Sequence, residues 1–172
     1  GFQILHTYGY ELLNGYLLSE LGFVYMLAGE LTLAFDTTEQ AFQANQAINS
    51  TLNASWMFER MALFSESAGN YPQSLIWAER AVAQNILIQN LESLSSALLV
   101  RGRVRLVLGE MLAAQADFSQ ALEISARKKI CTLAIQAHIE LGNLLSYRNA
   151  WSLAEEEYRS ALPLLAGNLI YT

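Results

Sequence analysis

Small and apolar residues recur along this chain with a period of forty positions. Five columns keep this spacing through four consecutive blocks without an insertion, and such regularity indicates an internal structural repeat. The columns are Gly22, Ala62, Gly102 and Gly142; Gly29, Gly69, Gly109 and Asn149; Ala34, Ser74, Ala114 and Ala154; Thr38, Ala78, Phe118 and Tyr158; and Ala41, Ala81, Ala121 and Ala161.

Each column has a physical role in a pair of antiparallel helices. A small residue such as Gly22 allows two helices to approach closely at their crossing, and the Ala or Ser column lies on the facing helix at the same crossing. Gly or Asn seven positions later accepts the left-handed conformation that ends a helix. The last two columns follow at helical spacing on one face, which predicts contact with the next hairpin.

The columns predict first helices over about 11–28, 52–68, 91–108 and 130–148, and second helices over about 31–46, 71–86, 111–127 and 151–163. Pro163 is expected to end or bend the last helix. The predicted fold class is all-α: a right-handed α-solenoid of about four antiparallel helical hairpins. We expect a single domain over residues 1–172, with repeats at about 11–50, 51–90, 91–130 and 131–170.

Composition agrees with a folded helical protein. Hydrophobic residues make up 53% of the chain and charged residues 15%, which is the opposite of the balance found in disordered chains. The net charge of −6 argues against direct nucleic-acid binding, which normally needs a basic face. Residues 11–50 contain five acids and no Lys or Arg, whereas residues 91–130 contain six bases and four acids. This asymmetry either orients a charged partner or reflects solvated helix faces.

The sequence also indicates where the protein resides. Cys131 is the only cysteine, so no intrachain disulfide can form, and a reducing cytoplasm fits this composition. We find no signal-peptide pattern, and the most apolar stretch, residues 15–28, is interrupted by Ser19 and Glu20. We therefore predict a cytoplasmic protein without a membrane partner.

The small-residue columns resemble the tetratricopeptide repeat. The first block carries most of that signature in Leu21-Gly22, Tyr25, Gly29, Ala34 and Ala41. The standard repeat has about thirty-four residues. Each block here therefore has about six more, which either longer helices or longer loops could accommodate.

A narrower resemblance is to the sensor region of large ATP-binding bacterial transcription regulators of the LuxR class, the group that includes the maltose-operon activator. Three stretches carry it: residues 21–31, residues 103–121, and residues 141–149 with the following Leu153-Ala154-Glu155-Glu156. The resemblance implies a sensor that binds an inducer or a regulatory protein. The ATPase and DNA-binding modules of that family are not in this sequence, which has no phosphate-binding loop, so we expect a segment of a longer protein.

In stacked hairpins the first helices line the concave face. We expect the outward positions of these helices to form an apolar groove with aromatic anchors for a peptide, a partner helix or an amphipathic small molecule. The candidate partner-binding residues are Tyr16, Phe23, Trp56, Glu59, Glu66, Arg103, Asn143 and Tyr147. Some apolar positions on these helices, such as Phe23 and Leu99, could equally belong to the core. Arg101 and Arg105 lie one turn apart and form either a salt-bridged surface or an anion site.

Catalysis has little support in the sequence. His6 and His138 are far apart, and no metal-ligand spacing is present, so we expect no enzyme activity, no cofactor and no metal. Three interpretations stay open: the sensor or protein-interaction region of a bacterial transcription regulator, a general protein–protein interaction scaffold, and an enzyme-associated repeat domain without its catalytic module. A closed polar pocket around Glu59, Arg103 and Asn143 would favour a chemical effector. No polar capping helix is evident, which predicts uncapped ends that could self-associate.

Overall fold

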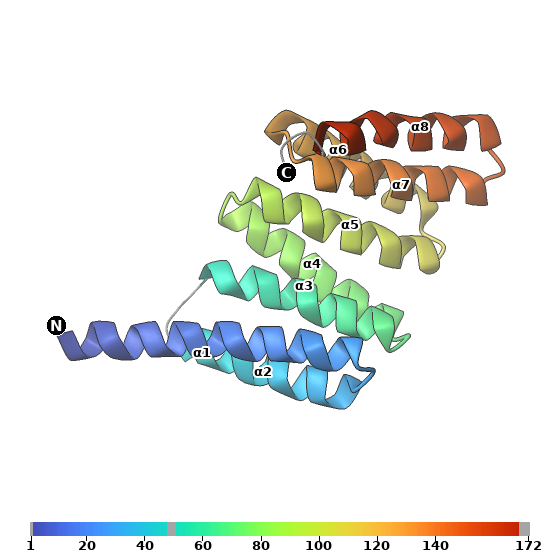
Figure 1. Ribbon diagram of the computed structural model, residues 1–172. Helices are drawn as coiled ribbons and strands as arrows, with labels where there is room; N and C mark the ends of the chain where they lie inside the picture. Colours follow the sequence, from blue (N-terminus) through green and yellow to red (C-terminus); the bar gives the residue numbers. More distant parts are fainter. Residues whose placement is uncertain (1, 48–50, 169–172) are drawn as a thin grey trace. The chain divides into compact units, whose positions relative to one another are not determined.

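The computed structural model describes residues 2–47 and 51–168 (Figure 1). These residues form helices joined by short turns, which confirms the all-α class. The helices are α1 (Phe2–Leu27), α2 (Leu31–Ala47), α3 (Thr51–Ser67), α4 (Tyr71–Leu87), α5 (Leu91–Val107), α6 (Met111–Lys128), α7 (Cys131–Tyr147) and α8 (Trp151–Asn168).

The helices from α2 onward begin at a regular interval of twenty residues, from Leu31 to Trp151. Each of the last three repeats therefore consists of two helices of 17 or 18 residues, with turns of only a few residues between helices wherever the turn is described. The residues beyond the usual repeat length of about thirty-four thus lie in longer helices and not in longer loops. The predicted repeat boundaries at residues 50 and 170 lie outside the described residues.

The turns inside the hairpins confirm the glycine and asparagine column. Gly29, Gly69 and Gly109 have φ values of 80°, 72° and 84°, and Asn149 has 58°. The amide of Glu30 donates to the carbonyl of Tyr25 at 2.9 Å, a hydrogen bond that closes the end of α1 around Gly29. The left-handed residue is therefore part of the helix stop, as its position in the repeat predicted.

Two turns between hairpins also contain a left-handed residue. Gln89 and Lys129 have φ values of 55° and 58°, and they too are forty positions apart. Neither residue type signals a left-handed conformation, so the sequence did not reveal these stops.

Close contact inside each hairpin explains the small first column. A Cβ atom added to Gly102 would come within 3.0 Å of three atoms of the Phe118 ring, and one added to Gly142 would meet the Tyr158 ring in the same way. At Ala62 the carbonyl accepts a hydrogen bond of 2.7 Å from the Ser74 hydroxyl. The column of Thr38, Ala78, Phe118 and Tyr158 thus packs on its own hairpin at these crossings, and its contact with the next hairpin stays a prediction.

The helices associate as consecutive pairs in two compact units, Gly1–Ile88 (unit 1) and Gln89–Thr172 (unit 2). In unit 1, α1 packs on α2 and α3 on α4, while α2 packs on α3 and joins the two hairpins. Unit 2 repeats the arrangement with α5–α6, α7–α8 and the α6–α7 joint. The four predicted hairpins are therefore present, and the single domain stays a prediction.

Two helix bounds differ from those predicted. α1 begins at Phe2, well before residue 11, and α8 continues through Pro163 to Asn168. The alternative in which Pro163 ends the helix is therefore wrong, because an internal proline removes one backbone hydrogen bond without preventing the turns on either side. Within residues 2–47 and 51–168, none of the helices combines the length and the apolar character needed to cross a membrane. The cytoplasmic location stays a prediction.

Candidate functional site

Two of the predicted aromatic residues lie together on neighbouring first helices of unit 1. Tyr16 on α1 and Trp56 on α3 stack with ring centroids 6.0 Å apart and an interplanar angle of 19°. Both remain open to solvent, with exposed fractions of 45% and 43%. They occupy the same column of successive repeats, so the contact between α1 and α3 brings them side by side.

An arginine extends this aromatic pair. The Arg60 guanidinium lies 4.8 Å from the centroid of the Phe23 ring and 5.5 Å from that of Trp56, which is within the range of a cation–π contact. Its Nη2 atom forms an ion pair with Glu20 Oε1 at 2.5 Å. Arg60 is thereby held between two rings and a carboxylate. We name this group of Tyr16, Glu20, Phe23, Trp56 and Arg60 the α1–α3 surface.

The sequence pointed to the three aromatic residues of this surface but not to Glu20 and Arg60. A signal was available, because these two opposite charges are forty positions apart and so occupy one column of adjacent repeats. Phe23 is half-buried, so its exposure does not decide whether it belongs to the groove or to the core. Leu99 is 2% exposed and belongs to the core.

Glu59 and Glu66 lie on α3, both half-buried. Each already takes part in an interaction within the chain. Their assignment as partner-binding residues stays a prediction.

A polar group occupies the first-helix side of unit 2. Arg103 on α5 pairs with Glu140 on α7, with 3.8 Å between Nη1 and Oε1. Asn143 donates to Glu140 at 3.3 Å and accepts a hydrogen bond of 2.9 Å from the Tyr158 hydroxyl of α8. We name Arg103, Glu140, Asn143 and Tyr158 the α5–α7 cluster. The predicted residue Tyr147 lies one turn beyond Asn143, at the end of α7, and is exposed.

The structure therefore places the predicted site residues in two groups. Tyr16, Phe23, Trp56, Glu59 and Glu66 belong to unit 1, and Arg103, Asn143 and Tyr147 belong to unit 2. The polar pocket predicted around Glu59, Arg103 and Asn143 needs residues of both units and stays a prediction.

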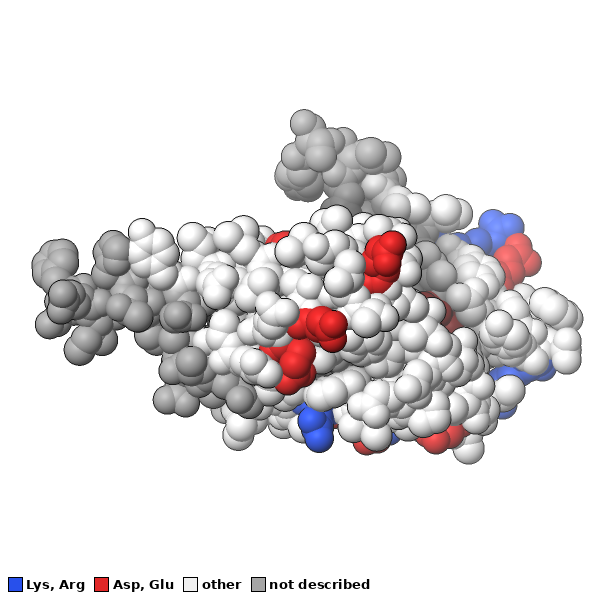
Figure 2. Space-filling model, turned by 90° about the horizontal axis from the view of Figure 1, so that it is seen from below, with Lys and Arg blue, Asp and Glu red and all other residues white. Residues whose placement is uncertain are grey.

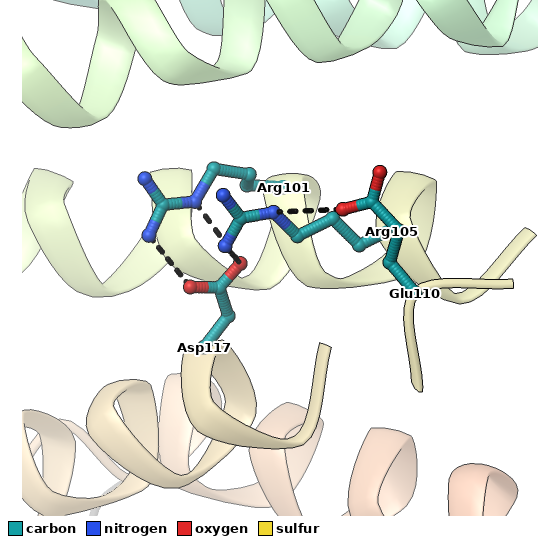
Figure 3. Close-up of polar contacts among 4 residues, drawn as sticks. All are labelled: Arg101, Arg105, Glu110 and Asp117. Atoms are coloured by element: carbon teal, nitrogen blue, oxygen red, sulfur yellow. Dashed lines mark hydrogen bonds and ion pairs between the residues drawn. The ribbon is translucent and has the colours of Figure 1, made fainter. Parts of the chain in front are cut away.

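Arg101 and Arg105 bind a carboxylate of their own chain (Figure 3). Arg101 holds Asp117 with two hydrogen bonds, Nε to Oδ2 at 3.0 Å and Nη2 to Oδ1 at 2.6 Å, and Arg105 Nη1 lies 2.9 Å from the same Oδ2. Glu110 lies 3.8 Å from Arg105 Nε. The Asp117 side chain is only 3% exposed. The salt-bridged alternative is thus the one found, and this cluster ties α5 to α6.

No family model and no curated protein matches this chain. Among solved structures, it is similar to BtubC (BKLC) from P. vanneervenii, with a TM-score of 0.74 and 16% sequence identity over 89% of this chain and 63% of that one. It is also similar to MamA, with a TM-score of 0.67 and 17% identity over 92% of this chain and 82% of that one. This chain spans 63% of the length of BtubC.

At these identities the likeness concerns the fold alone. The chain has a tetratricopeptide-like helical repeat fold. This confirms the broader of the two family resemblances, because the helix pairs, the turns and the similar structures all agree. The narrower LuxR-class resemblance is not shown by these similarities and stays a prediction.

Proposed function

We propose that this chain is a non-catalytic interaction scaffold that binds a segment of a partner protein on the α1–α3 surface. The observation that carries the proposal is the exposed Tyr16–Trp56 stack beside the positioned guanidinium of Arg60. Tyr, Trp and Arg are the residue types that contribute most to the binding free energy of protein interfaces. Here their rings already contact each other, which lowers the entropy cost of ordering them on binding.

The charge of unit 1 indicates the chemistry of the partner. Residues 1–88 contain eight acids and two bases, a net charge of −6, so the surroundings of the α1–α3 surface attract cations. Complementarity of charge mainly sets the rate and specificity of association, while apolar contacts supply affinity. We therefore propose a partner segment that combines apolar or aromatic side chains with Lys or Arg.

The test is a peptide array in which basic and apolar content vary independently, probed with the purified chain. Peptides that are both basic and apolar should bind best, and higher salt should weaken them. In the Trp56→Ala variant we expect a loss of about 2 kcal/mol in binding free energy. This is roughly a thirtyfold higher Kd.

Trp151→Ala is the matched control, because Trp151 is also an exposed tryptophan but lies on α8 of unit 2. It should leave peptide affinity unchanged, and circular dichroism should show equal helicity in both variants. A preference for acidic peptides, or an equal loss in both variants, would contradict the proposal.

A narrower hypothesis within this proposal is that the scaffold is the sensor region of a LuxR-class transcription regulator. It is supported by the three stretches that resemble that family and by the half-buried α5–α7 cluster, whose Arg103 and Asn143 could hydrogen-bond a polar effector. A thermal-shift screen against sugars and nucleotides tests it. An effector should raise Tm with its concentration in the native chain and not in Arg103→Ala. If no small molecule raises Tm while the chain still binds peptides, the sensor hypothesis would be rejected in favour of the general scaffold.

A further inference from the structure

Three consecutive basic residues, Arg127, Lys128 and Lys129, lie where α6 ends and the chain turns into α7. Arg127 and Lys128 belong to the last turn of α6, and Lys129 follows it in the left-handed conformation, with φ 58°. The side chains of all three are exposed. We name Arg127, Lys128 and Lys129 the basic turn.

The charges of the basic turn are not compensated by the part of the chain that the structure describes. None of its three side chains forms an ion pair, a hydrogen bond or a ring contact with residues 2–47 or 51–168. The other seven of the ten basic residues each have such a contact: Arg60 with Glu20, Arg80 with Trp77, Arg101 and Arg105 with Asp117, Arg103 with Glu140, Arg148 with Gln115, and Arg159 with Glu155. Three neighbouring positive charges are therefore available to a ligand from outside.

The repeat does not account for these charges. Forty positions earlier the equivalent turn consists of Leu87, Ile88 and Gln89, and Gln89 has a similar φ of 55°. Basic residues at the end of a helix interact favourably with its dipole, yet α4 and α7 have none in their last turn and α5 has one. Charged residues make up only 15% of the chain, and Figure 2 shows how sparsely they interrupt one face of the molecule. Three cations in a row are thus a property of this turn and not of the fold.

The helix that follows adds positive potential at the same place. α4 and α5 begin after Asn70 and Asn90, whose side chains accept a hydrogen bond from a backbone amide of the first helical turn. α7 begins after Ile130, which has no side-chain acceptor to offer. The positive end of the α7 dipole is therefore not capped by that residue, and it reinforces the attraction of the three cations for an anionic group.

The number of cations limits the size of the anion. A nucleic acid or an anionic membrane needs a broad basic face. The basic turn is instead bordered by Glu123, four residues before Arg127, and residues 89–172 carry eight acids against eight bases. A long polyanion would meet these carboxylates, whereas a short segment with a few Asp or Glu residues can pair with the three cations alone.

We propose that the basic turn is a docking site for a short acidic segment of a partner protein. It lies in unit 2, apart from the α1–α3 surface of unit 1, for which a basic and apolar segment is proposed above. The two sites attract opposite charges, so one scaffold holds an acidic and a basic segment. The basic turn shares no residue with the α1–α3 surface, and either site can be disproved without the other.

An NMR titration of the unmodified chain tests the proposal. The probe is a blocked peptide of glutamate and serine residues, and its neutral counterpart carries glutamine in place of glutamate. The acidic peptide should shift the amide resonances of residues 126–133, and higher salt should weaken its binding. The neutral peptide should leave these resonances unchanged.

A pair of double variants then assigns the binding to the basic turn. Arg127→Gln combined with Lys128→Gln should raise Kd about tenfold, because two exposed ion pairs are lost. The matched control combines Arg148→Gln with Arg159→Gln, which removes the same charge from unit 2 but at the other end of α7 and on α8. It should raise Kd by less than about twofold, because salt screens charges more than about 8 Å apart. Circular dichroism should show equal helicity in both variants.

Several results would overturn the proposal. Equal weakening in both double variants would mean that the peptide responds to net charge, and equal shifts with the neutral peptide, or no shifts at residues 126–133, would place no acidic segment at this turn. Displacement of the acidic peptide by inorganic phosphate at the same concentration, or by phosphatidylserine vesicles, would assign the turn to a phosphate group or a membrane. Salt-sensitive dimers of the unmodified chain that disappear in the Arg127→Gln, Lys128→Gln variant would assign it to a second copy.

Discussion

The two units share one backbone plan and differ in the chemistry of their side chains. Residues 1–88 hold thirteen of the eighteen aromatic residues, whereas residues 89–172 hold eight of the ten basic ones. With eight acids in each part, the net charge is −6 in the first and zero in the second.

The difference extends to what connects the helices. In unit 1 the joint between hairpins is aromatic, with Phe35 against Phe64 and Phe42 against Phe58. In unit 2 each hairpin contains a polar contact between its own two helices: Asp117 of α6 binds two arginines of α5, and His138 of α7 lies 2.7 Å from Glu157 of α8. The small residues at the helix crossings and the left-handed turns are common to both units, while the side chains between them differ in chemistry and therefore in what they can bind.

The largest expected effect comes from the aromatic joint. Phe64→Ala should lower the free energy of unfolding by about 4 kcal/mol, since it removes a fully buried ring that contacts Phe35. Urea denaturation measures this, and hydrogen exchange should show the loss at α2 and α3. Val24→Ala is the matched control in the same column of α1, and its exposed side chain should matter by less than about 0.5 kcal/mol. Equal effects would show that burial does not decide how much this column contributes to the free energy of unfolding.

The polar core of unit 2 should be nearly as sensitive. Asp117→Ala removes the buried carboxylate that holds Arg101 and Arg105 together and should cost about 3 kcal/mol. Thermal unfolding checks this, with Glu110→Gln as the control because Glu110 is exposed and 3.8 Å from Arg105. The control should cost at most about 0.5 kcal/mol. A small effect at Asp117 would mean that the stability of unit 2 does not depend on this polar cluster.

Gly102→Leu should destabilise the first hairpin of unit 2 by about 2 kcal/mol, because the new side chain collides with the Phe118 ring. The double variant with Phe118→Ala should recover part of this loss, and the coupling can be measured by denaturation. Additive losses would show that Gly102 and Phe118 do not share the crossing.

The smallest effect concerns the turns that both units share. Gly109→Ala forces a side chain into a left-handed conformation at φ 84° and should cost about 1 kcal/mol. At the equivalent Asn149, a change to Gly should be neutral or slightly stabilising. Differential scanning calorimetry of both variants measures these changes. If only Gly109→Ala lowers Tm, this column requires a residue that accepts the left-handed conformation. If both variants lower Tm, the column tolerates no substitution of either kind.

Much of the fold was predictable because its signals are local. Gly29 and Asn149 end helices through their own backbone preferences, and Gly102 marks a crossing because larger residues do not fit there. The stops at Gln89 and Lys129 were not predictable, since Gln and Lys adopt the left-handed conformation only when the surrounding helices impose it. The candidate site was predicted in part: Tyr16 and Trp56 were found as outward aromatics, while Glu20 and Arg60 were not.

The forty-residue register, the helix pairs and the turns inside them can be predicted from the amino-acid order, because they depend on residue size and backbone freedom at fixed spacing. Which side chains meet is visible only in the folded chain. The fold stacked Tyr16 on Trp56, placed Arg60 between Phe23 and Trp56, and gave Asp117 rather than a ligand to Arg101 and Arg105. Such contacts depend on the rotation and separation of neighbouring helices and on side-chain rotamers, which are set by the whole core and not by spacing along the chain.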